Sequence, residues 1–355
     1  MIRVAVVGLG IGREHLRALA SLPEEFEIAA LCDPDAERLE SVADEYGVAA
    51  RYSDLKDLLD AESLDIVDLA TPPDLHFDQS MRALRAGAHV ICEKPLVPSL
   101  RLLDELTRQE AESGRCVMPI FQYRFGSGIQ RLRHLADAGV TGRAYLSTVE
   151  TAWRRGKAYY SVPWRGRWDT ERGGVLLSHA IHAHDLLCFV VGDIRRVFAR
   201  ATTRVNEIET EDCAAASLEM ADGSLATLSA TLGSKHEISR MRFCFQYLTA
   251  ESSLQPYAPG NEPWIFTPGH PEVEKRMEEA LQSFEPRPEH GEEIVDLVPH
   301  LCRLPAEGGQ PGGAVFAGRR RFPEPRLEID QPPGEFRRDL EQSGLRLQIL
   351  LGGRH

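Results

Sequence analysis

The sequence contains no long apolar run, and this absence limits where the chain can reside. No stretch reaches the roughly 20 apolar residues that a membrane-spanning helix needs. The opening residues, MIRVAVVGLG, lack the basic region and the cleavage site of a secretory signal. We therefore expect a cytoplasmic protein with no membrane partner.

Positive charge and paired cysteines are also scarce. Lys and Arg total 41 against 54 Asp and Glu, which gives a formal net charge of −13. Nonspecific binding to nucleic acid depends on cationic side chains that neutralise phosphates, so no nucleic-acid partner is expected. The seven cysteines are odd in number and include no C-x-x-C pair, which is typical of reduced, buried thiols.

The length and the composition predict two domains followed by a divergent tail. A chain of 355 residues exceeds what one hydrophobic core usually serves. We expect a dinucleotide-binding domain over residues 1–122 and an α+β domain over 123–285. Residues 286–355 are expected to be poorly ordered, because 304–334 hold six Pro and six Gly among 31 residues. Within that tail, only GEFRRDLEQSGLRLQILL has the pattern of a helix.

The first 120 residues alternate short apolar runs with segments of helical spacing. The strand-like runs are IRVAVVG, FEIAALC, DIVDLA, HVICE and CVMPIF. Apolar residues recur at helical intervals in the segments between these runs. This alternation predicts an α/β fold of the Rossmann type, a parallel sheet wound with helices on both faces.

A glycine-rich loop follows the first strand and precedes a helix. Its residues are Gly8, Leu9, Gly10, Ile11 and Gly12. Glycines at such a place permit a tight turn and let backbone N–H groups approach a pyrophosphate at the helix N-terminus. The loop is one residue shorter than G-x-G-x-x-G, so its strand–loop–helix context carries the prediction. The alternative is a glycine-rich turn with no cofactor.

Asp33 ends the second strand, where a carboxylate can accept hydrogen bonds from the adenosine ribose. The same carboxylate would repel the additional phosphate of NADP. The cofactor is therefore predicted to be NAD, with NADP still possible because Arg38 lies one turn into the next helix.

Two further stretches follow strands of the same sheet. ATPPDLH occupies 70–76, after DIVDLA, and EKPL occupies 93–96, after HVIC. With the glycine loop, these motifs resemble the glucose-fructose oxidoreductase, inositol dehydrogenase and rhizopine catabolism (Gfo/Idh/MocA) family over roughly residues 1–285. The alternative for EKP is a solvated Glu-Lys pair at the end of a strand.

The resemblance implies roles for individual residues. It implies that Lys94 contacts the reacting hydroxyl of the substrate, where an ammonium would stabilise developing alkoxide character. It implies further cofactor contacts, from Thr71, Pro72, His76, Glu93, Lys94 and Gln122.

The segment LSHAIHAHDLL, residues 177–187, holds three histidines and an aspartate in an apolar run. It aligns with a family helix of the pattern D-x-G-x-H-x-x-D, although Ser178 replaces the first aspartate. On a regular helix turning about 100° per residue, Ser178, His182 and Asp185 share one face, whereas His184 points away. His182 is then the expected general base, and Asp185 either orients it or binds a substrate hydroxyl.

Two other interpretations of this segment stay open. A metal site would use His179, His182 and Asp185, but no thiolate or further carboxylate completes it by spacing, so no metal is predicted. The histidines could instead be buried structural groups. With catalysis favoured, Ser178 and His179 are expected to lie near the substrate.

The residues after 121 change pattern. Long alternating segments (RAYLSTVETAW, RRVFARATTRV, CAAASLEMADGSLATLSATLG and MRFCFQYLTAE) predict a large, mostly antiparallel open sheet with the histidine helix packed on one face. The resemblance implies that the free face of this sheet builds a homodimer or a homotetramer.

An aromatic and basic loop, AYYSVPWRGRW at 158–168, precedes the histidine segment. Aromatic rings suit the C–H faces of a sugar, and guanidinium groups suit hydroxyls or an acidic substituent. Trp164 and Arg165 are therefore expected near the substrate, with Tyr160, Arg154 and Arg155 as weaker candidates. A purely structural aromatic cluster is the alternative.

These features predict an NAD(P)-dependent oxidoreductase that transfers hydride between a secondary hydroxyl of a sugar, sugar derivative or cyclitol and nicotinamide. A second hypothesis is a redox-neutral, NAD-dependent enzyme that cleaves glycosides through transient oxidation. A third is a non-catalytic nicotinamide-binding sensor, which would have no need of Lys94 and His182.

Overall fold

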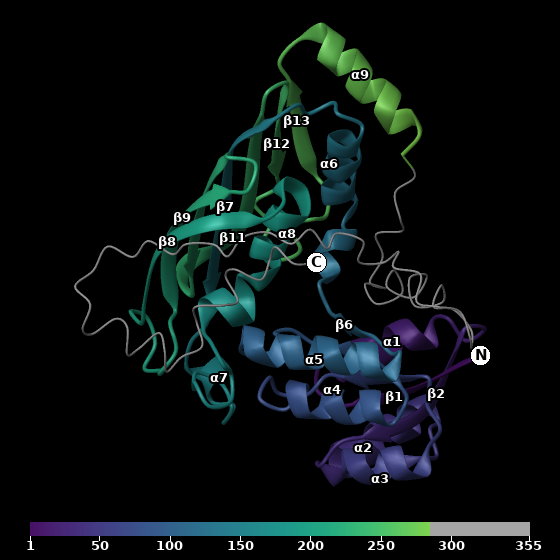
Figure 1. The fold of residues 1–355 in the computed structure, drawn as a ribbon. Helices are drawn as coiled ribbons and strands as arrows, with labels where there is room; N and C mark the ends of the chain where they lie inside the picture. The colour runs from purple at the N-terminus through teal and green to yellow at the C-terminus, as the bar shows by residue number, and fades with distance from the viewer. Residues whose placement is uncertain (285–355) are drawn as a thin grey trace. The chain divides into compact units, whose positions relative to one another are not determined.

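The computed structural model describes residues 1–284, which form two compact units, Met1–Ile120 and residues 121–284. Figure 1 shows the elements of each unit. The expectations for 286–355, including the helix in GEFRRDLEQSGLRLQILL, lie outside the described residues.

The first unit is built on a six-stranded parallel sheet of order β3-β2-β1-β4-β5-β6. The strands are β1 (Ile2–Val7), β2 (Phe26–Cys32), β3 (Arg51–Tyr52), β4 (Ile66–Leu69), β5 (His89–Cys92) and β6 (Val117–Pro119). Every strand-like run predicted in the first 120 residues forms a strand. The two-residue strand β3 was not predicted, because no apolar run marks it. The predicted parallel sheet is confirmed.

Helices follow each of the first five strands. They are α1 (Gly12–Ala20), α2 (Ala36–Tyr46), α3 (Leu55–Ala61), α4 (His76–Arg85) and α5 (Leu100–Ser113). Side-chain caps begin three of them, because Asp35, Asp54 and Ser99 accept hydrogen bonds from first-turn N–H groups. Their apolar faces complete a core that includes Val67, Leu84 and Val90, all fully buried.

The tight packing of the first turn requires a glycine. Gly8 has φ +89°, and a Cβ built on it would lie 2.5 Å from the carbonyl oxygen of Ala70, the residue after β4. A side chain here would push the loop away from the sheet. The glycine loop therefore lies directly against the end of the neighbouring strand.

The second unit contains a seven-stranded sheet of order β13-β12-β11-β7-β10-β9-β8. Its strands are β7 (Ala144–Arg154), β8 (Ile194–Thr202), β9 (Cys213–Met220), β10 (Leu225–Thr231), β11 (Gly233–Phe245), β12 (Leu248–Ser252) and β13 (Trp264–Pro268). The pair β7–β10 is parallel and the others are antiparallel, so the predicted mostly antiparallel sheet is confirmed. The single segment expected over CAAASLEMADGSLATLSATLG is two strands, β9 and β10, joined by a turn.

Alternating burial shows that one face of this sheet is the core face. Ala226, Leu228 and Ala230 of β10 are buried, while the residues between them are exposed. The helices of this unit are α6 (Ser127–Asp137), α7 (Lys157–Tyr160), α8 (Ile181–Val191) and α9 (Pro271–Gln282), with a 3₁₀ turn η1 (Gln122–Phe125) before α6. Apolar residues of α6 and α8, including Leu132, Leu186 and Leu187, pack in one core with the sheet.

The histidine segment is not one regular α-helix, which corrects the sequence prediction. Val175–His179 forms a π-helical turn, η2, and α8 begins only at Ile181, after Ala180. A spacing of 100° per residue therefore does not connect Ser178 to His182. Asp185, three residues after His182 on α8, still lies on the same side of that helix.

A buried glutamate holds the start of η2. The side-chain oxygens of Glu211 accept hydrogen bonds from the N–H groups of Gly174 and Leu176, at 3.0 and 3.1 Å, and its carbonyl oxygen accepts one from Val175. Burial raises the pKa of Glu211 to about 7, although these N–H donors oppose the shift. Gly174 allows this close approach, because a Cβ there would overlap the backbone of Glu211.

Gly174→Ala is expected to lower the free energy of unfolding by about 1–3 kcal/mol, because the added methyl group must displace the Glu211 backbone. Gly156→Ala is the matched control, since a Cβ at Gly156 meets nothing within 4 Å and should change stability by less than about 0.5 kcal/mol. Urea denaturation measures both. Equal stability of the two variants would show that Gly174 is not a packing constraint.

Candidate functional site

The glycine loop presents an open backbone at its centre. A Cβ on Gly10 would meet nothing within 4 Å, whereas one on Gly12 would press on Val6 and Ala70 at 3.0 and 3.3 Å. No side chain caps the first turn of α1. Gly12 is therefore required by packing, while Gly10 leaves room for a ligand to approach the backbone.

Asp33 lies at the end of β2 with 2% of its surface exposed. Its carboxylate accepts a hydrogen bond from the N–H of Leu9 at 2.7 Å, which ties it to the glycine loop, and another from Asp35. The guanidinium of Arg38 lies 3.2 Å from the same carboxylate. The sequence predicts Asp33 as the ribose-binding residue, and the structure brings Asp33, Leu9 and Arg38 together.

His76 joins the two loops that the sequence singled out after β4 and β5. Its Nδ1 lies 2.8 Å from the carbonyl oxygen of Pro95, and its Nε2 lies 2.7 Å from that of Thr71. The ring is fully buried, and burial lowers the pKa of His76 despite both carbonyls. Thr71 also donates from its hydroxyl to Gln79. In this structure the His76 ring lies between the Thr71 and Pro95 carbonyls, and a neutral ring donates a hydrogen bond to one of them.

Glu93 and Lys94 follow β5 directly, and a buried histidine on α1 reaches Glu93. The N–H of Lys94 donates to the Glu93 carboxylate at 3.0 Å. His15 places Nε2 at 3.3 Å from the other Glu93 oxygen and Nδ1 at 2.9 Å from both oxygens of Asp68. The sequence reasoning missed His15 and Asp68, because a histidine in a helix and an aspartate inside the apolar run DIVDLA carry no motif.

The charge state of His15 follows from its neighbours. Burial by itself lowers the pKa of His15, but the Asp68 and Glu93 carboxylates outweigh this effect and raise it to about 10. For a raised pKa of this kind, the stability from the ion pairs is complete below the ordinary histidine pKa near 6.5. It is lost as pH rises toward about 10. His15 is therefore an imidazolium at neutral pH.

His182 lies on α8 between aromatic rings, with 4% of its surface exposed. Its ring centroid is 4.4 Å from that of Tyr123 and 6.1 Å from that of Phe121. The neighbouring Asp185 receives two hydrogen bonds from the guanidinium of Arg124, one of them at 2.7 Å. Burial raises the pKa of Asp185, although Arg124 opposes this shift. Arg124 and Tyr123 come from η1, in which the sequence predicted only Gln122 as a site residue.

His179 belongs to a different cluster. Its ring lies 5.4 Å from Tyr159 and 5.8 Å from Trp153, measured between centroids. The guanidinium of Arg165 lies 3.8 Å from the centre of the Tyr159 ring and 4.5 Å from that of Trp164. The sequence-predicted residues His179 and Arg165 thus both contact Tyr159, which the sequence did not single out, and Arg165 also contacts Trp164. Ala180, between the end of η2 and the start of α8, separates this cluster from His182 along the chain.

Three other predicted positions have distinct surroundings. The Ser178 hydroxyl, on η2, donates to the carbonyl of Gly173 at 3.2 Å, just before that turn. The side-chain oxygen of Gln122 is buried and has no hydrogen-bond partner among the described residues. Arg155, a weaker candidate, pairs with Glu237 at 3.1 Å and lies over the Tyr159 ring.

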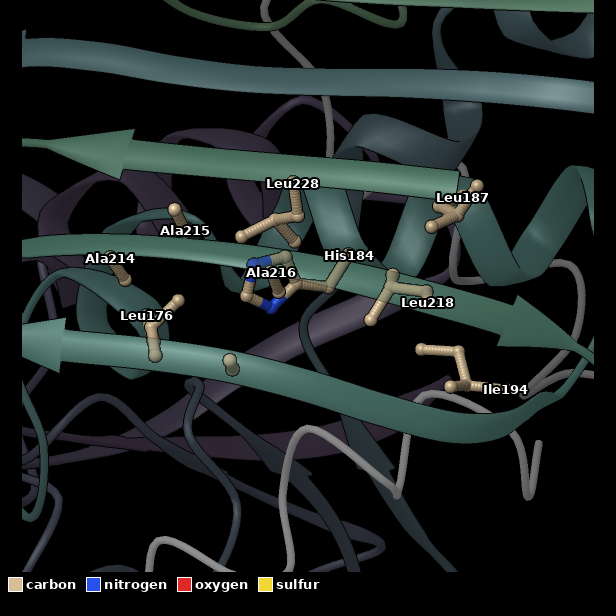
Figure 2. Close-up of a pocket in the computed structure, with 10 residues that line it drawn as sticks. Leu176, His184, Leu187, Ile194, Ala214, Ala215, Ala216, Leu218 and Leu228 are labelled. Carbon is tan, nitrogen blue, oxygen red and sulfur yellow. The ribbon is translucent and has the colours of Figure 1, made fainter. Parts of the chain in front are cut away.

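His184 lines a small apolar pocket between α8 and the sheet, with alanine and leucine side chains of β8, β9 and β10 around it. Figure 2 shows its ring among Ala216, Leu218 and Leu228. Burial lowers the pKa of His184 to about 4, and its Nε2 has no hydrogen-bond partner in the part of the chain that the structure describes. It is a neutral, packed histidine, as the helical spacing indicated.

Residues 1–284 contain no group of three or more His, Cys, Asp or Glu side chains arranged to hold a metal ion. No helix in that range is long and apolar enough to cross a membrane. The six described cysteines are free thiols.

Comparison with known proteins assigns each unit to the same family. Residues 2–121 match the model of the oxidoreductase family with an NAD-binding Rossmann fold. Residues 129–246 match the model of the GFO/IDH/MocA C-terminal domain.

Curated relatives and solved structures agree with these matches. The D-glucoside 3-dehydrogenase of Escherichia coli is 29% identical over 195 residues, 54% of this chain and 54% of the relative. The inositol 2-dehydrogenase of Salmonella typhimurium is 30% identical over 171 residues, 45% of this chain and 51% of the relative. The chain thus spans about half the length of these curated relatives.

Among solved structures, the WlbA dehydrogenase from Bordetella pertussis, in complex with NADH and UDP-GlcNAcA, has a TM-score of 0.73 and 26% identity. The match covers 85% of this chain and 89% of that one. From the fold, the two domain models and these relatives, the chain belongs to the Gfo/Idh/MocA family of oxidoreductases, with an NAD-binding Rossmann domain and a family C-terminal domain.

Proposed function

We propose that the protein is an NAD-dependent dehydrogenase that oxidises a secondary hydroxyl of a sugar, a sugar derivative or a cyclitol. The observation that carries this proposal is the position of Glu93 and Lys94, directly after β5, at the same edge of the parallel sheet as the glycine loop. Open α/β sheets bind their ligands at this edge. The relatives that act on a glucoside and on inositol, and the WlbA complex with NADH, support the substrate class and the cofactor.

The residues of the first unit fit a dinucleotide. Gly10 leaves the loop backbone open, and the uncapped start of α1 offers N–H groups to a pyrophosphate. Asp33 is the group for the adenosine ribose. We propose NAD rather than NADP because a 2′-phosphate would meet the Asp33 and Asp35 carboxylates, and Arg38 is already paired with both. When bound, the nicotinamide would accept the hydride.

The proposed chemistry divides between two side chains. The ammonium of Lys94 donates a hydrogen bond to the reacting oxygen, which favours loss of its proton. The imidazole of His182 takes that proton, since an imidazole can accept a proton near neutral pH. The ion pair between Arg124 of η1 and Asp185 of α8 holds these two elements together beside His182. Trp164, Arg165 and His179 belong to the aromatic cluster that includes Tyr159, and we propose that this cluster contacts the sugar.

The test incubates the purified protein with NAD or NADP and a panel of polyols, uronic acids and glycosides, and follows NADH absorbance. We expect NADH formation that is faster with NAD than with NADP. Lys94→Ala and His182→Ala are each expected to lower kcat by about 10²-fold or more, because each removes a group that acts on the reacting proton.

Matched controls separate this result from loss of folding. Lys56→Ala, on the exposed face of α3, and His236→Ala, exposed on β11, should retain the wild-type rate. Glycoside cleavage without net NADH would favour the redox-neutral reaction. Silence in both assays, from folded protein that binds NAD, would contradict an enzymatic function.

We also propose that the chain forms a homodimer or homotetramer through the outward face of the large sheet. One row of paired residues crosses all seven strands on that face: Ile265, Glu251, Arg242, Thr148, Thr227, Ser217 and Phe198. None of them is buried, and Ile265 and Phe198 are 66% and 51% exposed. The row holds three small hydroxyl side chains, the paired charges of Glu251 and Arg242, and an apolar side chain at each end, a composition that suits face-to-face packing of two sheets.

Ser217→Arg places a long cation beside Phe198 in this row and is expected to convert the oligomer to monomer, because the charge would be buried without a partner. Light scattering after size-exclusion chromatography measures the mass. Glu278→Arg, on the exposed side of α9, is the control and should keep the wild-type mass. A wild-type monomer, or an unchanged oligomer in Ser217→Arg, would contradict this interface.

A further inference from the structure

A buried ion-pair network connects three elements of the first unit. His15 comes from the first turns of α1, Asp68 from the middle of β4, and Glu93 from the residue after β5. His15 is 3% exposed and Asp68 is fully buried. Within residues 1–284, the side chains that form hydrogen bonds with the His15 ring are those of Asp68 and Glu93.

Both ring nitrogens of His15 face carboxylate oxygens, and these carboxylates raise the pKa of His15 to about 10, so that each nitrogen carries a proton at neutral pH. Nδ1 faces the two Asp68 oxygens at 2.9 Å, and Nε2 faces a Glu93 oxygen at 3.3 Å. Ionised carboxylates only accept hydrogen bonds, and a neutral imidazole has a single N–H. The ring is therefore an imidazolium that bridges two carboxylates, and the other oxygen of Glu93 is engaged by the N–H of Lys94.

The free-energy cost of removing buried charges from water offsets most of the attraction between them. We therefore look for the effect of this network in the geometry that it imposes. Asp68 pairs with Val6 of β1 and Ile91 of β5, which places it in the middle of the sheet and makes it a rigid anchor for the ring. The ring then fixes the Glu93 carboxylate relative to α1, the helix that begins at the glycine loop. The glycine loop and the Glu93–Lys94 segment, both at the carboxyl edge of the sheet, are thus held at a fixed distance from each other.

We propose that His15 is a positioning residue that acts through Glu93, holding the Glu93–Lys94 segment in register with the glycine loop so that both contact the dinucleotide at once. This inference rests on the proposed function, since it needs a nicotinamide cofactor at this edge. His15 itself does not touch the reacting atoms.

A double-mutant cycle on NAD affinity tests the proposal. Dissociation constants are measured by calorimetry for wild type, His15→Gln, Glu93→Gln and the double variant. We expect His15→Gln to weaken NAD binding about tenfold, which is the size of a lost charge-assisted hydrogen bond. In the Glu93→Gln background, His15→Gln should change the dissociation constant less than twofold, because its effect passes through Glu93.

The control histidine is His89, at the amino end of β5, where it contacts Cys116. His89→Gln should leave NAD affinity within twofold of wild type. His15→Gln leaves two facing carboxylates without their cation and could fail to fold. The variant His15→Gln/Asp68→Asn restores the formal charge of the network and should fold while still binding NAD about tenfold more weakly.

A pH comparison tests the charge state of His15, on which the proposed bridge depends. The groups that face His15 are the carboxylates of Asp68 and Glu93, and with them the imidazolium persists through neutral pH. The affinity ratio between wild type and His15→Gln is therefore expected to be the same at pH 6 and at pH 8.5.

Unchanged NAD affinity in His15→Gln, an equal tenfold loss in the Glu93→Gln background, or a ratio that collapses between pH 6 and 8.5 would each overturn the inference while leaving the proposed function intact. A wild-type protein that binds neither NAD nor NADP would overturn both.

Discussion

The site depends on one constraint of the parallel sheet, which gathers the carboxyl ends of its strands at a single edge. At that edge the glycine loop follows β1, Asp33 follows β2, and Glu93 follows β5. Side chains then connect these loops to one another. Asp33 accepts a hydrogen bond from the N–H of Leu9, and the His76 ring lies within 2.8 Å of backbone carbonyls in two neighbouring loops. The edge is therefore a network of bonded loops rather than a set of separate motifs.

The second unit uses burial in a different way. An interruption at Ala180 places His179 and His182 in separate aromatic surroundings, so two histidines three residues apart can serve two purposes. His184 is directed into an apolar pocket and is neutral. One short segment thus holds the proposed base His182, the proposed substrate contact His179 and the packed histidine His184.

Sequence reasoning could predict the fold because it depends on local patterns, and the roles of the motif residues stay predictions. Alternating apolar runs indicated the sheets, and the glycine loop indicated the ligand edge. It could not predict the π-helical turn, which depends on the distant Glu211 binding the backbone of Gly174. It also missed the pairs Arg124–Asp185 and His15–Glu93, because tertiary contacts between residues far apart in sequence leave no spacing to detect.

The most direct test of the central claim follows the hydride itself. The protein is incubated with NAD and with glucosides, uronic acids and cyclitols that carry deuterium on every carbinol carbon, and the reduced cofactor is weighed by mass spectrometry. The account predicts NADH that is one mass unit heavier than the product from unlabelled substrate, because the carbon-bound hydrogen passes to the nicotinamide without exchange. Reduced cofactor without the label, or no reduced cofactor from folded protein under any of these conditions, would contradict it.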